Sequence, residues 1–293
     1  MVKKILLGTL ALAAVLAFTS CGTREEAGNS EMIQVNVGSK KASVDYTNES
    51  GDITRDFKSL QNQHSDAICK ITTKINGNDC DGVMGYVFDY KDNGNDTVNF
   101  SIAALRIKKN GTKHYAGAYV ETYQNVTKDS FTNGPRFKNT SGNDAVPVSK
   151  GGWTNYDDSP FGKKLNITEN ELENMITASE AAGKGKTVTF WVEVVGNLGS
   201  GVTGRSGDAG SYTVNFYKED PERNKGAGNT LTYKEGVTPI DTATIDEQYT
   251  FTKFSDSLPQ LEMGFYATVY AGQTLTGTWD FDEIRGEAEE IEE

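Results

Sequence analysis

The sequence predicts an all-β protein, an antiparallel β-sandwich with one short helix. Apolar and polar residues alternate in many short runs, clusters of Gly, Asn and Asp separate these runs, and one segment alone shows a helical pattern. Many short strands joined by polar turns are typical of a sandwich. The predicted strands are residues 68–75, 83–90, 99–107, 115–123, 187–195, 212–217, 249–254, 265–270 and 275–281.

Three Asn-Gly pairs lie between consecutive runs, and Asn-Gly is the strongest short signal for a β-hairpin. The sequence therefore predicts three tight hairpins. Their turns are Asn76-Gly77, Asn93-Gly94 and Asn110-Gly111.

The helix is predicted after Thr168, which forms a capping box with Glu171. Leu172 and Ile176 then fall on one face, and Gly183 offers a C-terminal stop. A single helix among strands is usually a connector between sheets or a cover on a sandwich edge. Residues 133–156 are rich in Gly, Asn, Ser and Pro and are predicted to form a loop of a length that is often functional.

The N-terminal segment, residues 1–20, has the pattern of a secretory signal peptide, with Lys3 and Lys4 ahead of an apolar run that is too short to span a bilayer. Its end, Phe18-Thr19-Ser20-Cys21, resembles the lipobox of bacterial lipoproteins. The resemblance implies that Cys21 is lipidated and anchors the protein in a membrane, with the outer membrane, on its periplasmic face or at the cell surface, as the expected location. The other reading is an ordinary cleavage site beside a chance cysteine.

The remaining boundaries follow from composition. Residues 21–40 are expected to hold the lipidated cysteine and a flexible tether, residues 41–286 the sandwich domain, and residues 287–293 an acidic tail. The 293-residue chain carries a formal charge of −12, which disfavours nucleic acid as a partner. Cys69 and Cys80 lie in a compartment that permits a disulfide, and the sequence leaves their pairing open.

Two segments together resemble the concanavalin A-like lectin and glucanase superfamily, which includes laminin-G-like domains. The first is residues 85–89, Gly-Tyr-Val-Phe-Asp, with the strand that begins at Asn99, and the second is residues 264–267 leading to the closing run 279–284. The resemblance implies a jelly-roll topology for the sandwich, and it supports a fold more than a function.

Calcium is one cofactor to consider, since Asp89, Asp92 and Asp96 crowd oxygen ligands into one turn. The spacing is not that of an EF-hand, and Asp is also a common turn former. The sequence otherwise predicts no cofactor.

Catalysis is not expected. The two histidines are not placed with a nucleophile. Asp280, Asp282 and Glu283 form the nearest acidic run to a glycosidase pair but lack its spacing.

Aromatic side chains provide the functional candidates. On run 187–195 the alternation places Trp191 and Glu193 opposite the apolar face, and the same parity exposes several tyrosines among polar neighbours. Rings beside carboxylates and amides suit saccharide stacking. The expected function is therefore that of a non-enzymatic lipoprotein binding a glycan or surface polymer; the alternatives are a structural or antigenic lipoprotein and a glycan-degrading enzyme. The remaining candidate ligand residues are Tyr115, Tyr119, Tyr217, Tyr266 and Tyr270.

Overall fold

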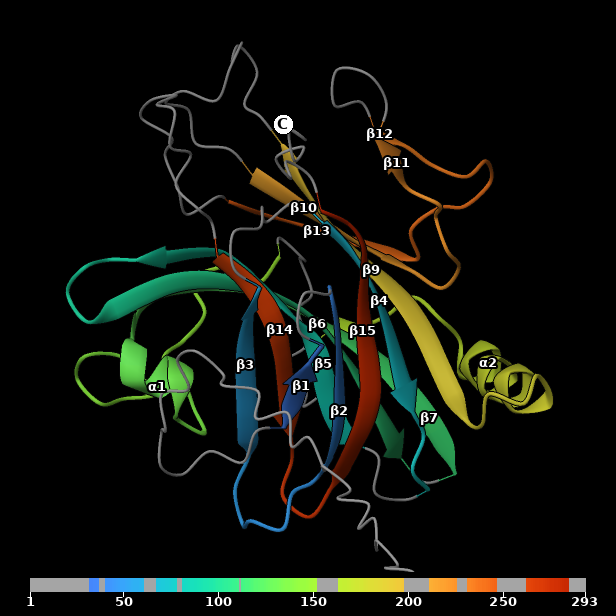
Figure 1. The fold of residues 1–293 in the computed structure, drawn as a ribbon, viewed down its shortest axis with the longest axis horizontal. Coiled ribbons are helices and arrows are strands. Elements are labelled where there is room, and N and C mark those ends of the chain that lie inside the picture. The colour runs from blue at the N-terminus through green and yellow to red at the C-terminus, as the bar shows by residue number, and fades with distance from the viewer. Residues whose placement is uncertain are drawn as a thin grey trace, which may run out of the picture. The chain divides into compact units, whose positions relative to one another are not determined.

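A computed structural model gives the fold as an all-β, antiparallel jelly-roll sandwich of two sheets (Figure 1). The sequence prediction of the fold class is confirmed. The structure describes residues 32–36, 40–60, 67–77, 81–110, 112–151, 163–197, 211–225, 231–246 and 262–284.

The first sheet has seven strands, and every pairing in it is antiparallel. In spatial order they are β1 (Ile33–Val35), β2 (Lys41–Thr47), β15 (Thr274–Ile284), β4 (Ala67–Lys74), β9 (Thr187–Asn197), β10 (Ser211–Tyr217) and β13 (Asp241–Asp246).

The second sheet has six strands, also antiparallel throughout. In spatial order they are β3 (Thr54–Leu60), β14 (Glu262–Val269), β5 (Asp81–Asp92), β6 (Thr97–Asn110), β7 (Lys113–Thr127) and β8 (Lys163–Lys164). A separate small hairpin pairs β11 (Asn224–Lys225) with β12 (Leu231–Thr232).

Every predicted strand that falls on described residues is present, whereas run 249–254 lies outside them. The sequence missed β2 and β3, among others, because their alternation is weak. On β2 the fully buried side chains are those of Ala42 and Val44, and on β3 they are those of Asp56 and Leu60. So little apolar surface leaves no clear period-two pattern.

The hairpin at Asn93-Gly94 is confirmed, since β5 pairs with β6. Strands β6 and β7 pair on either side of the predicted Asn110-Gly111 turn, in which Gly111 lies outside the described residues. The hairpin predicted at Asn76-Gly77 is wrong. Strand β4 before it lies in the seven-stranded sheet, and β5 after it lies in the six-stranded sheet. Both edges of β4 are taken by β15 and β9, so the turn leads the chain from one sheet to the other.

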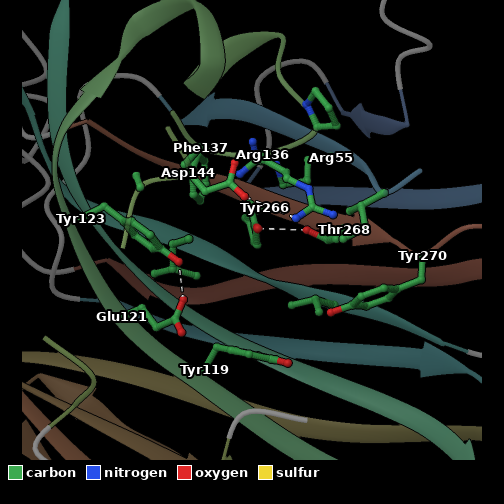
Figure 2. Close-up of a pocket in the computed structure, with 15 residues that line it drawn as sticks. Arg55, Tyr119, Glu121, Tyr123, Arg136, Phe137, Asp144, Tyr266, Thr268 and Tyr270 are labelled. Atoms are coloured by element: carbon green, nitrogen blue, oxygen red, sulfur yellow. Dashed lines mark hydrogen bonds and ion pairs between the residues drawn. The ribbon is translucent and has the colours of Figure 1, made fainter. Parts of the chain in front are cut away.

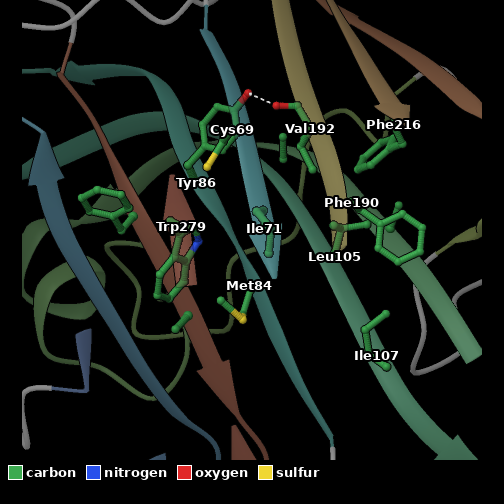
Figure 3. Packing of buried hydrophobic residues seen from close by; sticks show 14 of the residues in the cluster. Cys69, Ile71, Met84, Tyr86, Leu105, Ile107, Phe190, Val192, Phe216 and Trp279 are labelled. Carbon is green, nitrogen blue, oxygen red and sulfur yellow. Dashed lines mark hydrogen bonds between the residues drawn. The ribbon is translucent and has the colours of Figure 1, made fainter. Parts of the chain in front are cut away.

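The main core lies between the sheets and is fixed by polar contacts that cross it (Figure 3). Trp279 Nε1 donates to the Gly85 carbonyl at 2.9 Å, and the Tyr86 hydroxyl donates to the Val192 carbonyl at 3.2 Å. A Cβ atom on Gly85 would lie 2.2 Å from the carbonyl oxygen of Ala103, so this position needs glycine. Each of the two segments that carry the superfamily resemblance thus contributes a buried aromatic side chain to the main core, Tyr86 from the first and Trp279 from the second.

Helix α2 (Glu169–Ala181) is confirmed, including its capping box and the positive φ of Gly183 that follows it. It contacts β7 and β9 and buries Leu172 and Ile176 in the main core. A second helix, α1 (Lys128–Thr132), was not predicted, because five residues are too few to show a period. None of the helices in the described ranges is long and apolar enough to cross a membrane.

Several predictions concern residues outside the described ranges: the signal peptide, Cys21, the tail 287–293 and Cys80. Cys69 is buried in the main core, where its Sγ contacts the Lys70 carbonyl at 3.8 Å. Strand β1 falls within the segment expected to be a tether, so the seven-stranded sheet already begins at Ile33.

Candidate functional site

The outer face of the six-stranded sheet carries a second apolar cluster, separate from the core between the sheets. Segment 128–150, which contains α1 and the first part of the predicted loop 133–156, supplies Phe131 and Phe137 to it. Residues 152–156 of that loop lie outside the described ranges. Phe100 on β6 packs against both, with ring centroids 4.7 and 4.9 Å away. The segment therefore covers one end of a face that a simple sandwich would leave in solvent.

A pocket of about 260 Å³ opens beside this cluster (Figure 2). The floor comes from the outer faces of β3, β14, β5, β6 and β7, and segment 128–150 supplies one wall. The polar and aromatic side chains that line it are those of Arg55, Tyr119, Glu121, Tyr123, Arg136, Phe137, Asp144, Tyr266, Thr268 and Tyr270.

Strand alternation decides which side chains reach this pocket. On β7, Ala118 and Val120 point into the main core, so Tyr119 and Glu121 point outward. On β14, Ala267 packs in the main core while its neighbours face the pocket.

Two of the tyrosines are held by a buried ion pair. Arg106 donates to both carboxylate oxygens of Asp81, at 2.6 and 2.8 Å, and both residues are buried. The Arg106 guanidinium lies 3.9 Å from the centre of the Tyr270 ring, and its Nη1 is 3.5 Å from the Tyr119 hydroxyl. A planar group fixed in this way restricts the movement of both rings.

Arg55 enters from β3 and joins the sheet to the covering segment. Its Nη2 donates to the Gly134 carbonyl at 2.7 Å and to the Ser130 carbonyl at 3.3 Å, and the guanidinium lies 3.6 Å from the centre of the Phe137 ring. Its Nε is buried and has no acceptor among the residues that the structure describes. Burial lowers the pKa of Arg55, although a guanidinium remains charged at any physiological pH.

The protonation states of three polar groups that line the pocket follow from their surroundings. Burial raises the pKa of Tyr119 and of Tyr266, so both remain neutral hydroxyls near neutral pH. The Tyr266 hydroxyl accepts from Thr268 Oγ1 at 2.9 Å. A hydrogen bond from Lys138 lowers the pKa of Asp144, which keeps that carboxylate ionised.

Three of the predicted ligand residues, Tyr119, Tyr266 and Tyr270, meet in this pocket. Tyr115 lies on the same strand and face as Tyr119 but outside the pocket, with Lys164 Nζ 5.0 Å from its ring centre. The other three predicted residues lie in the seven-stranded sheet.

Glu193 and Tyr217 are buried, which differs from the exposed placement that the alternation predicts. The Glu193 carboxylate accepts from the hydroxyls of Tyr217 and Tyr233, at 2.9 and 2.8 Å, and from Asn215 Nδ2 at 3.0 Å. Arg223 Nη1 lies 3.4 Å away. These donors come from β10 and from the segment that carries the β11–β12 hairpin, so the cluster fastens that segment to the sheet.

Trp191 lies on the same outer face of the seven-stranded sheet as Glu193, as the alternation predicts. Its Nε1 is buried and has no acceptor among the described residues, and Lys70 Nζ is 5.6 Å from its ring centre. It therefore cannot contribute to the pocket on the other sheet.

The acidic candidates are not brought together as a site. Asp92 pairs with Lys128 at 2.7 Å and accepts from the backbone of Gly94, and Asp280 pairs with Lys41 at 2.7 Å. Within the described ranges, Asp89, Asp92 and Asp96 do not form a metal-holding group, and neither does any other set of three His, Cys, Asp or Glu. The side chains of Asp282 and Glu283 lie outside the described ones.

The sequence did not predict the charged side chains Arg55, Arg136 and Asp144 as part of the site. Arg55 lies on the weakly patterned β3, and Arg136 and Asp144 lie in an irregular loop. The composition of residues 133–156 identified that loop as a functional candidate, but no periodic signal shows which of its side chains turn toward the sheet.

No protein-family model, curated protein or solved structure matches this chain.

Proposed function

We propose that this protein is a membrane-anchored lipoprotein whose β-sandwich binds a saccharide, without catalysis, in the pocket on the outer face of the six-stranded sheet. The observation that carries the proposal is the convergence of tyrosine rings with charged side chains in one pocket. The bound sugar belongs to a glycan or surface polymer.

The chemistry of the pocket suits a sugar ring. Sugars present apolar faces that pack on aromatic rings, together with hydroxyls that need fixed donors and acceptors. Tyr119 and Tyr270 supply rings already held by Arg106, while Glu121 and Thr268 supply polar groups. A volume of about 260 Å³ is slightly below the range of about 300 to 1,000 Å³ for drug-sized ligands, which favours one sugar unit of a longer chain.

The anchor is proposed from the lipobox-like end of the signal segment. Each buried methylene of a lipid chain contributes about 0.8 kcal/mol, so two or three chains on Cys21 suffice for stable attachment. This places the domain beside an outer membrane, where surface or periplasmic glycans are available.

A glycan array tests the binding proposal, using the detergent-solubilised full-length protein. We expect at least one saccharide class to bind above background, and Tyr270→Ala to weaken it about tenfold through loss of the ring face, which corresponds to about 1.4 kcal/mol. Tyr115→Ala is the matched control, because this tyrosine lies on the same sheet face but outside the pocket. No binding to any glycan would leave a structural or antigenic surface lipoprotein as the function.

A further inference from the structure

Arg55, which is partly buried, differs in its partners from the two buried arginines, Arg106 and Arg223. Arg106 pairs with Asp81, and Arg223 pairs with Glu193. Arg55 instead donates to two backbone carbonyls, and no Asp or Glu of the described chain forms an ion pair with it. Arg55 is partly buried and lines the pocket, so the pocket holds a partly desolvated positive charge that a ligand could neutralise.

The acids that line the pocket do not neutralise Arg55. Asp144 pairs with Lys138 and with Arg136, the latter at 3.4 Å. Glu121 accepts a hydrogen bond from the Tyr123 hydroxyl at 2.7 Å. Figure 2 shows Arg55 and Arg136 on one side of the pocket and Glu121 with Tyr119 on the other, so the pocket has a cationic end and a hydroxyl-binding end.

We propose that the pocket selects a sugar that bears a carboxylate, with Arg55 as the counter-charge and Arg136 as a second cation at the rim. This inference rests on the proposed saccharide-binding function. The carboxylate pairs with the side of the Arg55 guanidinium that lines the pocket, the sugar ring packs on Tyr270, and Glu121 accepts from the sugar hydroxyls.

Uronic acids and sialic acids share this chemistry, and matched pairs of probes separate them. Isothermal titration calorimetry on the detergent-solubilised full-length protein compares a galacturonate trimer with galactotriose, and sialyllactose with lactose. In at least one pair we expect the acidic member to bind about ten- to a hundredfold more tightly, the range of one charge-assisted hydrogen bond. The pair that shows the preference identifies the source of the carboxylate.

Three variants test the role of the arginines. Arg55→Gln should remove most of the preference for the acidic member, and Arg55→Lys should keep part of it. Arg136→Gln provides an independent test if Arg55→Gln fails to fold, since Arg136 is half-exposed and its loss should weaken the acidic member more than the neutral one. Lys184→Gln is the control for charge, because Lys184 is exposed on the turn after α2 and should leave both affinities unchanged.

The outcomes distinguish this inference from the proposed function. Equal binding of the acidic and neutral members, with both lost in Tyr270→Ala, would overturn the carboxylate preference and keep the saccharide site. An acidic preference that persists in both Arg55→Gln and Arg136→Gln would also overturn it. No binding of any of these probes, together with a blank glycan array, would overturn both proposals.

Discussion

Glu193 is the residue whose role changes most between sequence and structure. The alternation on β9 placed it on a face away from the apolar side, where a ligand could reach it. In the folded chain its side chain has no exposed surface, and three hydrogen-bond donors and the Arg223 guanidinium surround it. A carboxylate that is fully occupied by its own chain serves stability, because it satisfies polar groups that would otherwise be buried alone.

We predict that Glu193→Ala lowers the free energy of unfolding by about 3 to 5 kcal/mol, because it leaves the Arg223 charge buried without its carboxylate. The measurement is equilibrium unfolding in urea. Glu235→Ala is the matched control. Glu235 is exposed in the segment that carries the β11–β12 hairpin, and its substitution should change the free energy of unfolding by no more than about 0.5 kcal/mol. Equal effects of the two substitutions would show that the buried cluster contributes nothing specific.

At the scale of elements, helix α2 shows how local signals can suffice. The Thr168 backbone N–H donates to Glu171 Oε2 at 2.9 Å, and the Glu171 N–H donates to Thr168 Oγ1 at 3.2 Å. These are contacts within one turn, so they are encoded in consecutive residues and were predicted from them. The Asn76-Gly77 turn is equally local, but it does not make a hairpin. Whether such a turn makes a hairpin depends on which strands pair with the two edges of β4, and those strands are distant in the sequence.

The same capping box predicts a pH dependence. Hydrogen bonds from Thr168 and Lys218 lower the pKa of Glu171 to about 2. Because the folded pKa is below the ordinary value of 4.5, the contribution to stability is present above pH 4.5 and disappears as the pH falls toward about 2. We therefore expect the stability difference between the wild type and Glu171→Ala to shrink over this interval.

Urea unfolding at several pH values between neutrality and the acid limit measures that difference. Glu180→Ala removes an exposed carboxylate from the same helix, away from its N-terminus, and controls for the change in helix propensity. A stability difference for Glu171→Ala that stays constant across the interval would contradict the prediction.

At the scale of the whole molecule, the lipid anchor that we propose on Cys21 has a direct test. We predict that Cys21→Ser moves the protein from the detergent-extracted membrane fraction to the soluble periplasmic fraction, because the acylated sulfur is absent. Cell fractionation with immunoblotting measures this, and mass spectrometry of the N-terminal peptide checks the lipid directly. Cys80→Ser serves as the cysteine control and should remain membrane-bound, whereas membrane attachment of Cys21→Ser would rule out this anchor.

The pocket itself was partly predictable. Tyr119, Tyr266 and Tyr270 were found because each alternates with residues of the main core, and parity assigns a side chain to a face. Parity does not say which strands share a sheet, so Trp191, Glu193 and Tyr217 were grouped with them although they lie on the other sheet. Arg55 and Arg136 were missed because neither a weak strand nor an irregular loop has a period.

The sequence by itself determined the fold class, most of the strands, helix α2 and the face on which each strand residue lies. These properties depend on hydrogen bonding and burial within a few consecutive residues. Only the tertiary structure decided which strands distant in the sequence pair, that segment 128–150 covers the outer face, and that Arg55 lines one pocket with four tyrosines and has no carboxylate partner among the described residues. Such contacts join residues far apart in the chain, so they form only when the strands and segment 128–150 pack against one another in the folded protein.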